Sequence, residues 1–128
     1  MGNDKKCGPK VLVVDDAPFM RGMVKYFLAQ GGYEVCGEAG NGRQAIELLQ
    51  ALSPDLVIMD IIMPDMSGVE AVREIRRNGG RVKILMLSAV SNKPVVSLAM
   101  DAGATDFLAK PFKRDVFLNK VSEVLRVP

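Results

Sequence analysis

Short apolar runs recur along this chain, and each is followed by a segment with helical periodicity. The clearest runs span residues 11–14, 56–59 and 82–87, the last interrupted only by Lys83. Such runs are typical of strands buried on both faces of a parallel sheet, because half-exposed strands alternate between apolar and polar residues. The segments between the runs place apolar residues three and four positions apart, as amphipathic helices do. The alternation therefore predicts an α/β fold whose parallel sheet is covered by helices on both faces.

Turn and capping residues set the boundaries of the expected elements. Pro18 suits the first turn of a helix, Ser67 suits a helix cap, and either Ser91 or Asn92 suits another. Gly40-Asn41-Gly42 is expected to form a turn, and the alternating residues 33–39 indicate an edge strand. The expected strands span 11–14, 33–39, 56–59, 82–87 and 107–109, and the expected helices span about 18–30, 45–52, 67–77, 92–102 and 113–126. The predicted fold is flavodoxin-like, a doubly wound (βα)5 arrangement with five parallel strands in the order 2-1-3-4-5.

Length and composition limit the setting in which this fold can work. A chain of 128 residues fits one domain with a single core. The apolar runs are far shorter than the ~20 residues that a membrane-spanning helix needs, and the N-terminus lacks the apolar core of a signal peptide. We therefore expect a cytoplasmic, monomeric protein without a membrane partner. Residues 1–9 are expected to be a flexible tail, and residues 10–128 to form the domain.

Charge and the supply of metal ligands exclude several classes of function. The net charge is only +2, aromatic residues make up 5% of the chain, and the basic residues form two small clusters that suit solvated faces. These features argue against a nucleic-acid partner. Histidine is absent, and Cys7 and Cys36 lack metal-ligand spacing, which excludes the usual zinc sites and His-dependent triads. Cys7 is expected in the tail, and Cys36 in a strand as a reduced thiol. The two basic clusters are Arg73, Arg76 and Arg77, and Lys110, Lys113 and Arg114.

Polar side chains follow four of the five expected strands. Asp15 and Asp16 follow the first strand, Asp60 the third, Ser88 the fourth and Lys110 the fifth. Each alone is well explained as a turn residue, a cap or a solvated lysine, but the carboxyl ends of parallel strands share the edge where ligands bind. Three carboxylates at one edge repel each other unless a cation neutralises them. Mg²⁺ is the predicted ion, because it prefers carboxylate oxygens, and the absence of histidine and of clustered cysteines counts against softer metals.

The same residue types suit phosphoryl transfer. An aspartate can act as a nucleophile and become an aspartyl phosphate. The ammonium of Lys110 can neutralise phosphoryl oxygens, and the hydroxyl of Ser88 can donate a hydrogen bond to one of them. Phosphoryl transfer asks a protein mainly for positioning and charge stabilisation, and this set of side chains supplies both.

Four segments together resemble the receiver domains of two-component response regulators, in particular the stand-alone CheY-like members. The resemblance extends from Lys10 to Leu125 and is carried by VLVVDDAPFMR, LVIMDIIMPDMSG, ILMLSAV and FLAKPF. It implies a phosphorylatable signalling switch rather than an enzyme with an external substrate. Such a protein catalyses its own Mg²⁺-dependent phosphorylation and dephosphorylation. The phosphodonor would be a histidine kinase or a small molecule such as acetyl phosphate.

The resemblance also implies roles for individual residues. Asp60 would accept the phosphoryl group, and Ser88 and Lys110 would contact its oxygens. Mg²⁺ would be bound directly by Asp16, Asp60 and the backbone carbonyl of Ile62. Asp15 would bind the ion through a water molecule. The Lys110-Pro111 bond would be cis, and Ala89 would leave room for the phosphoryl group.

Phosphorylation is expected to act at a distance through Ser88 and Phe107. The added charge and acceptor oxygens would draw Ser88 inward, Phe107 would rotate into the space, and the surface of the fourth helix, fifth strand and fifth helix would change. The implied output partner is a flagellar motor switch component or a phosphatase, in chemotaxis or motility. Ile62 and Val90 are apolar where the family tunes phosphoryl lifetime, and we expect them to hinder the attacking water. Candidates for the output surface are Lys93, Val96, Met100, Phe107, Lys113 and Phe117.

Other functions compete with this interpretation. A phosphorelay intermediate, which passes the group to another histidine protein, has the same sequence features. A phosphatase with an Asp nucleophile needs a second acid two residues later, where this chain has Ile62. An FMN carrier needs a phosphate cradle after the first strand, where Asp15 and Asp16 would repel the phosphate. A DNA-binding regulator needs an output domain, and the chain as given has no room for one after residue 127. A receiver cut from a longer protein stays an open alternative.

Overall fold

Five parallel strands form one sheet in the order β2-β1-β3-β4-β5, as predicted. The structure is a computed structural model that describes residues 8–128. The predicted tail at residues 1–7, with Cys7, lies outside the described residues. The strands are β1 (Lys10–Val14), β2 (Glu34–Ala39), β3 (Leu56–Asp60), β4 (Lys83–Ser88) and β5 (Asp106–Ala109). The helices are α1 (Pro18–Gln30), α2 (Gly42–Leu52), α3 (Gly68–Arg77), α4 (Lys93–Ala102) and α5 (Arg114–Arg126).

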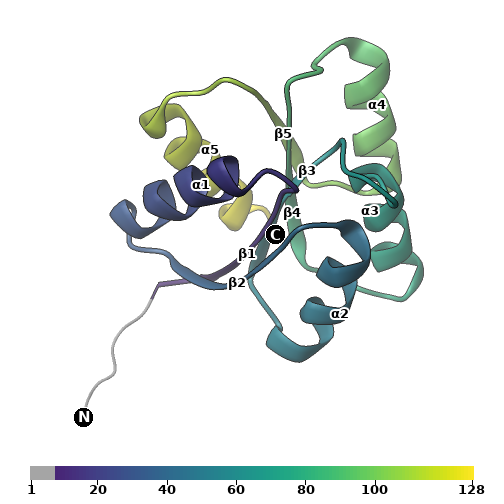
Figure 1. Ribbon diagram of the computed structural model, residues 1–128, viewed down its shortest axis with the longest axis horizontal. Coiled ribbons are helices and arrows are strands. Elements are labelled where there is room, and N and C mark those ends of the chain that lie inside the picture. Colours follow the sequence, from purple (N-terminus) through teal and green to yellow (C-terminus); the bar gives the residue numbers. More distant parts are fainter. Residues whose placement is uncertain (1–7) are drawn as a thin grey trace.

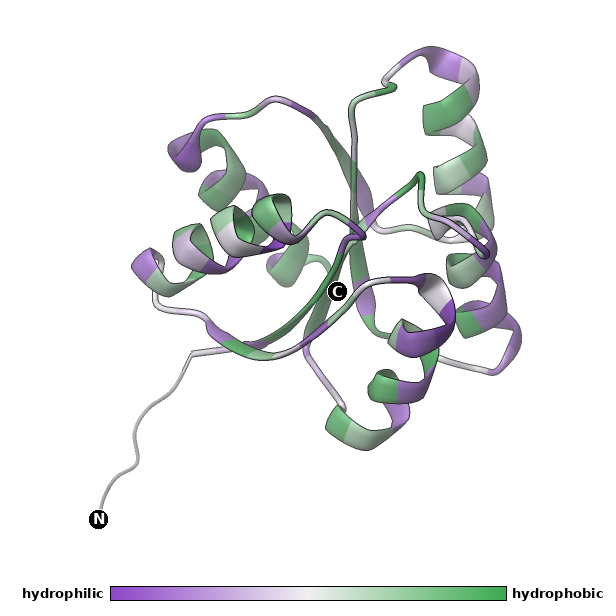
Figure 2. Cartoon of the chain, viewed as in Figure 1, coloured by the Kyte–Doolittle hydropathy of each residue, from purple (hydrophilic) through white to green (hydrophobic). Residues whose placement is uncertain are grey.

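The helices cover the sheet in two layers, with α1 and α5 on one face and α2, α3 and α4 on the other (Figure 1). Successive β1 side chains point to opposite faces, so Val11 and Val13 pack under α1 and α5, while Leu12 and Val14 pack under the other three helices. The central strands are apolar on both faces for this reason, and Figure 2 shows their apolar colouring beside the polar outer sides of the helices. Within residues 8–128 the longest helices have 13 residues, and none could cross a membrane.

Capping residues define where three helices begin. Ser67 caps α3 in a capping box with Glu70, in which each side chain accepts from the other residue's backbone. Asn92 rather than Ser91 caps α4, and its side chain accepts from the Val95 amide at 3.1 Å. The predicted turn at 40–42 is wrong at its last residue, because Gly42 is the first residue of α2. Asn41 caps that helix, and its side chain accepts from the Gln44 amide at 2.9 Å.

The edge strand β2 is irregular. Its register with β1 shifts between the pairs Val11–Val35 and Leu12–Gly37, so Cys36 is an extra residue in the strand. Cys36 is a free, half-buried cysteine in a strand, as predicted. The predicted tail extends to residue 9, but the Pro9 carbonyl already accepts a hydrogen bond from the Glu34 amide at 3.0 Å. Pairing with β2 therefore starts one residue before β1.

Phe117 does not lie on the output surface where the sequence places it. Its side chain is fully buried between α1 and α5, stacked on Phe112 with ring centroids 5.2 Å apart and tilted against Phe27 at 6.1 Å. The apolar periodicity of α5 gives no direct sign of which apolar residue is deepest. Phe117 is thus a core residue through which α5 packs against α1.

The prediction that Arg76 lies on a solvated helix face is also wrong. Its guanidinium donates to the backbone carbonyls of Gly103 at 3.0 Å, Gly80 at 3.1 Å and Val82 at 2.7 Å. These bonds tie the end of α3 to the turn after α4 and to the loop before β4. Burial lowers the pKa of Arg76 from its ordinary value. Since arginine still stays charged at neutral pH, it acts here as a structural clamp.

Replacing Arg76 with Met should destabilise the fold by about 2 kcal/mol, because three half-buried carbonyl oxygens lose a charged donor. Urea unfolding followed by circular dichroism measures this loss. Arg73 lies on the same helix and is exposed, so Arg73→Met is the matched control and should change stability by less than about 0.5 kcal/mol. Equal stability of the two variants would contradict the role given to Arg76.

Candidate functional site

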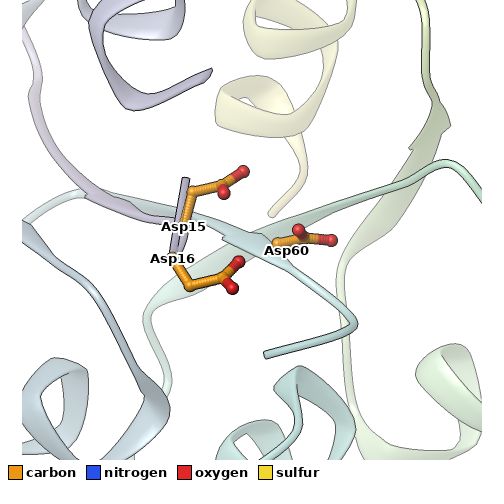
Figure 3. Close-up of side chains that lie close together, drawn as sticks. All are labelled: Asp15, Asp16 and Asp60. Atoms are coloured by element: carbon orange, nitrogen blue, oxygen red, sulfur yellow. The ribbon is translucent and has the colours of Figure 1, made fainter. Parts of the chain in front are cut away.

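The polar residues predicted at the strand ends lie together at one edge of the sheet. Asp15 and Asp16 directly follow β1, and Asp60 is the last residue of β3, the strand next to β1. Carboxylate oxygens of these three residues lie within 4.8 Å of one another, and Figure 3 shows the three side chains together. Ser88 ends β4, the neighbour of β3. The strand order thus brings together residues up to 73 positions apart in the chain.

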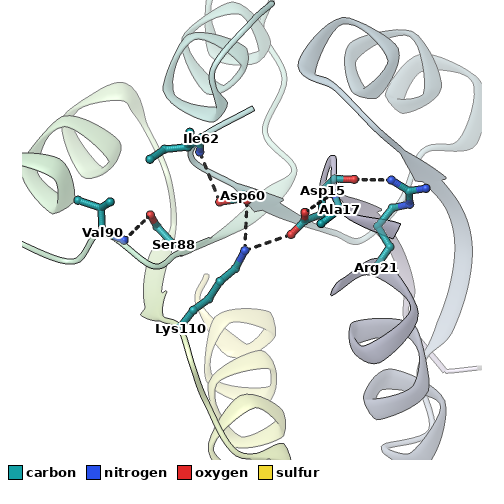
Figure 4. Close-up of polar contacts among 8 residues, drawn as sticks. All are labelled: Asp15, Ala17, Arg21, Asp60, Ile62, Ser88, Val90 and Lys110. Atoms are coloured by element: carbon teal, nitrogen blue, oxygen red, sulfur yellow. Dashed lines mark hydrogen bonds and ion pairs between the residues drawn. The ribbon is translucent and has the colours of Figure 1, made fainter. Parts of the chain in front are cut away.

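Lys110 joins two of the acids. Its Nζ lies 3.1 Å from Asp60 Oδ2 and 3.2 Å from Asp15 Oδ2 (Figure 4). The loop that carries Lys110 is fixed by a hydrogen bond from the Lys110 amide to the Ser88 carbonyl at 2.9 Å and is followed by a cis Lys110–Pro111 bond, as expected. All three side chains are largely buried. The ammonium is therefore held against the carboxylates with little screening by water.

Asp60 carries a perturbed ionisation. Desolvation raises the pKa of its carboxyl above the ordinary value of 3.8, and the hydrogen bond and charge of Lys110 only partly oppose this. Asp60 is 9% exposed and ends β3 at the carboxyl edge of the sheet. A largely buried carboxylate whose charge Lys110 only partly compensates is suited to bind a cation or to attack an electrophile.

Replacing Asp60 with Asn should stabilise the metal-free protein at neutral pH. A carboxyl whose pKa is higher in the folded than in the unfolded state costs stability as the pH rises above the unfolded pKa, and the full cost is reached above the folded pKa. The gain should therefore be present at neutral pH and should disappear as the pH falls through the folded pKa towards 3.8. Urea unfolding in EDTA over this range measures it. The exposed acid Asp101 is the control, and an Asp60→Asn gain that grew in acid would contradict the assignment.

Ser88, Val90 and Ile62 lie on the side of Asp60 away from Asp15 (Figure 4). Ser88 is 1% exposed, and its Oγ accepts from the Val90 amide at 3.0 Å, which leaves the hydroxyl proton free to be donated. The Ile62 amide donates to Asp60 Oδ1 at 3.4 Å, while the Ile62 side chain is 59% exposed. Figure 4 shows Ile62 and Val90 on the same side of Asp60 as Ser88.

The donor set fits a hard divalent cation. Three carboxylates against one ammonium leave a formal charge of −2 at this edge of the sheet. Asp16 is exposed, so the cluster can be reached from solvent. Oxygen ligands with room for several waters are what Mg²⁺ requires. This acidic cluster could hold such an ion; the role of the Ile62 carbonyl stays a prediction.

The remaining predicted residues come from β5, from α4 and from the residue before α5. Phe107 is half-buried on β5, beside Met86 of β4, and packs on the core under α2, α3 and α4. Lys93 and Met100 on α4, and Lys113, are exposed, and Val96 is half-buried.

Arg21 is a site residue that the sequence did not reveal. Its guanidinium donates to the backbone carbonyl of Asp15 at 2.6 Å. The only indication in the sequence is a basic residue five positions after Asp16. Because basic residues are common on surface helices, this position alone does not predict a contact with the acids.

Comparisons with known proteins agree with this geometry. Residues 11–122 match the model of the response regulator receiver domain. The chain is 48% identical over 119 residues to the chemotaxis protein CheY of Thermotoga maritima, covering 91% of this chain and 99% of the relative. It is similar in structure to the receiver domain of NarL from Mycobacterium tuberculosis, with a TM-score of 0.91, 31% identity, and coverage of 96% and 100% of the two chains.

A further similar structure is CheY of Borrelia burgdorferi in a complex with CheX, BeF3 and magnesium. Its TM-score is 0.89, with 26% identity and coverage of 94% of this chain and 92% of the other. The match of the family model to most of the chain, the near full-length likeness to a CheY protein and the shared strand order lead to one conclusion. The chain belongs to the response regulator receiver domain family and is a CheY-like receiver domain of two-component signalling.

Proposed function

We propose that this protein is a stand-alone phosphorylatable switch in which Asp60 accepts a phosphoryl group from a histidine kinase. One observation carries the proposal: the Asp60 carboxylate lies at the carboxyl end of β3, with Lys110 Nζ at 3.1 Å and two further acids beside it. An Asp60 oxygen attacks phosphorus, the bond from phosphorus to the imidazole nitrogen breaks, and the electron pair stays on that nitrogen. The product is an acyl phosphate on Asp60 and a free histidine on the kinase.

Charge stabilisation is the main demand of this transfer. Lys110 neutralises phosphoryl oxygens, and Ser88 donates its hydroxyl proton to one of them. Asp16, Asp60 and the Ile62 carbonyl are the proposed Mg²⁺ ligands, with Asp15 acting through water. When bound, Mg²⁺ offsets negative charge on the phosphoryl oxygens. The magnesium in the complex of the Borrelia CheY supports this choice of ion.

In the proposed switch, a conformational change that begins at Ser88 on phosphorylation reaches α4, β5 and α5. Ser88 is separated from the start of α4 by residues 89–92 only, so a shift of Ser88 towards the phosphoryl group pulls on the α4 N-terminus. Phe107 lies on the neighbouring strand and can rotate into the space that opens. Exposed apolar residues on α4 and α5 suit a partner surface, in agreement with a switch between two arrangements. They are Leu98 and Met100 on α4 and Val116 on α5.

Chemotaxis is the proposed setting, because the Thermotoga relative with nearly the same length is a chemotaxis protein. The output partner is then a flagellar motor switch component or a phosphatase, and the site of action is the cytoplasm, where the kinase is phosphorylated. The CheX complex of the Borrelia CheY supports a protein partner that binds the receiver.

Mass spectrometry of the intact protein tests the proposed function. Incubation with acetyl phosphate and Mg²⁺ should add ~80 Da, the mass of one phosphoryl group, and EDTA should prevent the addition. No mass gain with either acetyl phosphate or a phosphorylated histidine kinase would refute the proposed function.

Replacing Ile62 with Asn should shorten the phosphoryl lifetime several-fold. The exposed Ile62 side chain flanks Asp60 and offers water no hydrogen bond, whereas an amide can hold the attacking water. Loss of the phosphoryl mass with time, after acetyl phosphate is removed, measures the rate. Val116→Asn is the control, because Val116 is similarly exposed but lies on α5. An unchanged or slower rate in Ile62→Asn would count against this role.

A further inference from the structure

Arg21 links the acidic turn to the edge strand of the sheet. From the first turns of α1, its Nη1 donates to the Asp15 backbone carbonyl at 2.6 Å, and its Nε donates to Glu38 Oε1 on β2 at 3.0 Å. Figure 4 shows the guanidinium beside the Asp15 carbonyl, away from Lys110. The Arg21 side chain is only 21% exposed. One planar group thus bridges two elements whose residues are far apart in sequence.

The backbone of this turn decides where the acids lie. The Asp15 amide donates to the Ala39 carbonyl at 3.0 Å, and the Ala17 amide donates to Asp15 Oδ1 at 2.9 Å. The Arg21 contact fixes the remaining polar group of Asp15, its carbonyl, which belongs to the peptide unit that leads into Asp16. The Asp16 side chain is exposed, so packing holds it weakly and its position follows from this backbone.

Glu38 neutralises the charge of Arg21. The hydrogen bond from Lys25, at 2.6 Å, is the main reason that the pKa of Glu38 lies below its ordinary value, and Arg21 adds to the effect. Glu38 is therefore ionised at neutral pH, and Arg21 is held by a fixed charge partner. Lys25 shares this partner with Arg21, but its ammonium is bonded to Glu38 alone among the described residues.

We infer that Arg21 is a positioning residue for cation binding, bracing the Asp15 carbonyl against Glu38 so that Asp15 and Asp16 face Asp60. The inference rests on the proposed function, because it takes Mg²⁺ as the ion at the acid cluster. Two effects of replacing Arg21 on Mg²⁺ affinity have opposite directions. A positive charge near three carboxylates weakens cation binding by Coulomb repulsion, so loss of the charge alone would tighten binding. Loss of the hydrogen bonds from Arg21 to Asp15 and Glu38 would weaken binding.

Calorimetric titration with MgCl2 separates these effects. Arg21→Met should raise the Kd for Mg²⁺ by about tenfold, the usual effect of losing a group that orients a metal ligand. Lys25→Met removes the same charge beside Glu38 without touching Asp15, so its Kd should be unchanged or lower. Arg21→Lys keeps the charge but cannot bridge both oxygens in the same way, and its Kd should lie between those of the wild type and Arg21→Met.

Amide hydrogen exchange in EDTA provides a readout without metal. The Asp15 and Ala17 amides should exchange faster in Arg21→Met than in the wild type and Lys25→Met. If wild type binds Mg²⁺ and Arg21→Met binds it equally well or more tightly, the inference is overturned. If wild type binds no Mg²⁺, the metal site of the proposed function fails, while unchanged exchange in Arg21→Met and Arg21→Lys would overturn the bracing role on its own.

Discussion

Asp60→Asn is expected to abolish the ~80 Da gain from acetyl phosphate and Mg²⁺. The amide oxygen of Asn is a much weaker nucleophile than a carboxylate, and attack through it would not give a stable acyl phosphate. The fold should survive the change, because Asn is of the same size and can still accept the hydrogen bond that Lys110 Nζ makes at 3.1 Å. The loss should be complete within detection, the largest effect expected of any single substitution in the chain.

Asp65→Asn is the matched control for this result. Asp65 lies five residues later in the loop after β3, is exposed, and has a φ of 69° that Asn tolerates well. It should be phosphorylated like the wild type. A mass gain that persists in Asp60→Asn would remove Asp60 as the acceptor, and peptide mapping of the phosphorylated wild type would then identify the residue that replaces it in the mechanism.

Lys110→Met is expected to slow phosphorylation by acetyl phosphate about a hundredfold, the usual effect of removing one preorganised charge-stabilising group. In the wild type, Lys110 Nζ is shared between Asp15 and Asp60 at 3.2 and 3.1 Å. Without it, phosphoryl oxygens approaching Asp60 lose their nearest fixed positive charge. Mg²⁺ binding should stay as tight or become tighter, because the ammonium and the cation repel each other and share the same carboxylates.

The opposite directions of these two effects make the Lys110 prediction specific. Initial rates of mass gain at saturating Mg²⁺ measure the chemistry, and calorimetry measures the binding. Lys113→Met is the control, since Lys113 is exposed three residues later and should leave both quantities unchanged. A Lys110→Met protein that is phosphorylated at the wild-type rate would exclude charge stabilisation by this residue. A loss of Mg²⁺ binding would indicate instead that the site had collapsed.

The sequence predicts the acid cluster because one rule connects it to the fold. Apolar runs identify the buried strands, and the residues that end parallel strands share one edge of the sheet. Asp15, Asp60, Ser88 and Lys110 therefore meet by virtue of their places at strand ends, whatever the details of packing. The helix boundaries were predictable to within a few residues for a similar reason, since caps such as Ser67 act on amides three residues away.

Phe117 and Arg76 show where this reasoning stops. Both lie on helices, and the spacing of apolar residues along a helix does not distinguish a fully buried position from a neighbouring half-exposed one. Only the packing of α5 on α1 buries Phe117 under Phe27, and only the approach of the turn at Gly103 to α3 gives Arg76 its acceptor 27 residues away. Helical spacing describes one element, whereas these contacts depend on how two elements are placed.

By itself, the sequence determined the five strands, their parallel order and the set of residues at the sheet edge, because local hydrophobicity and strand ends carry that information. The tertiary structure alone showed how differently the two adjacent acids are buried. Asp15 is 3% exposed and paired with Lys110, whereas Asp16 is exposed. It also revealed that Arg21 joins them to Glu38, 17 residues away. Which carboxylate is buried and which is open depends on the path of the turn through space, and that path is set by contacts between elements.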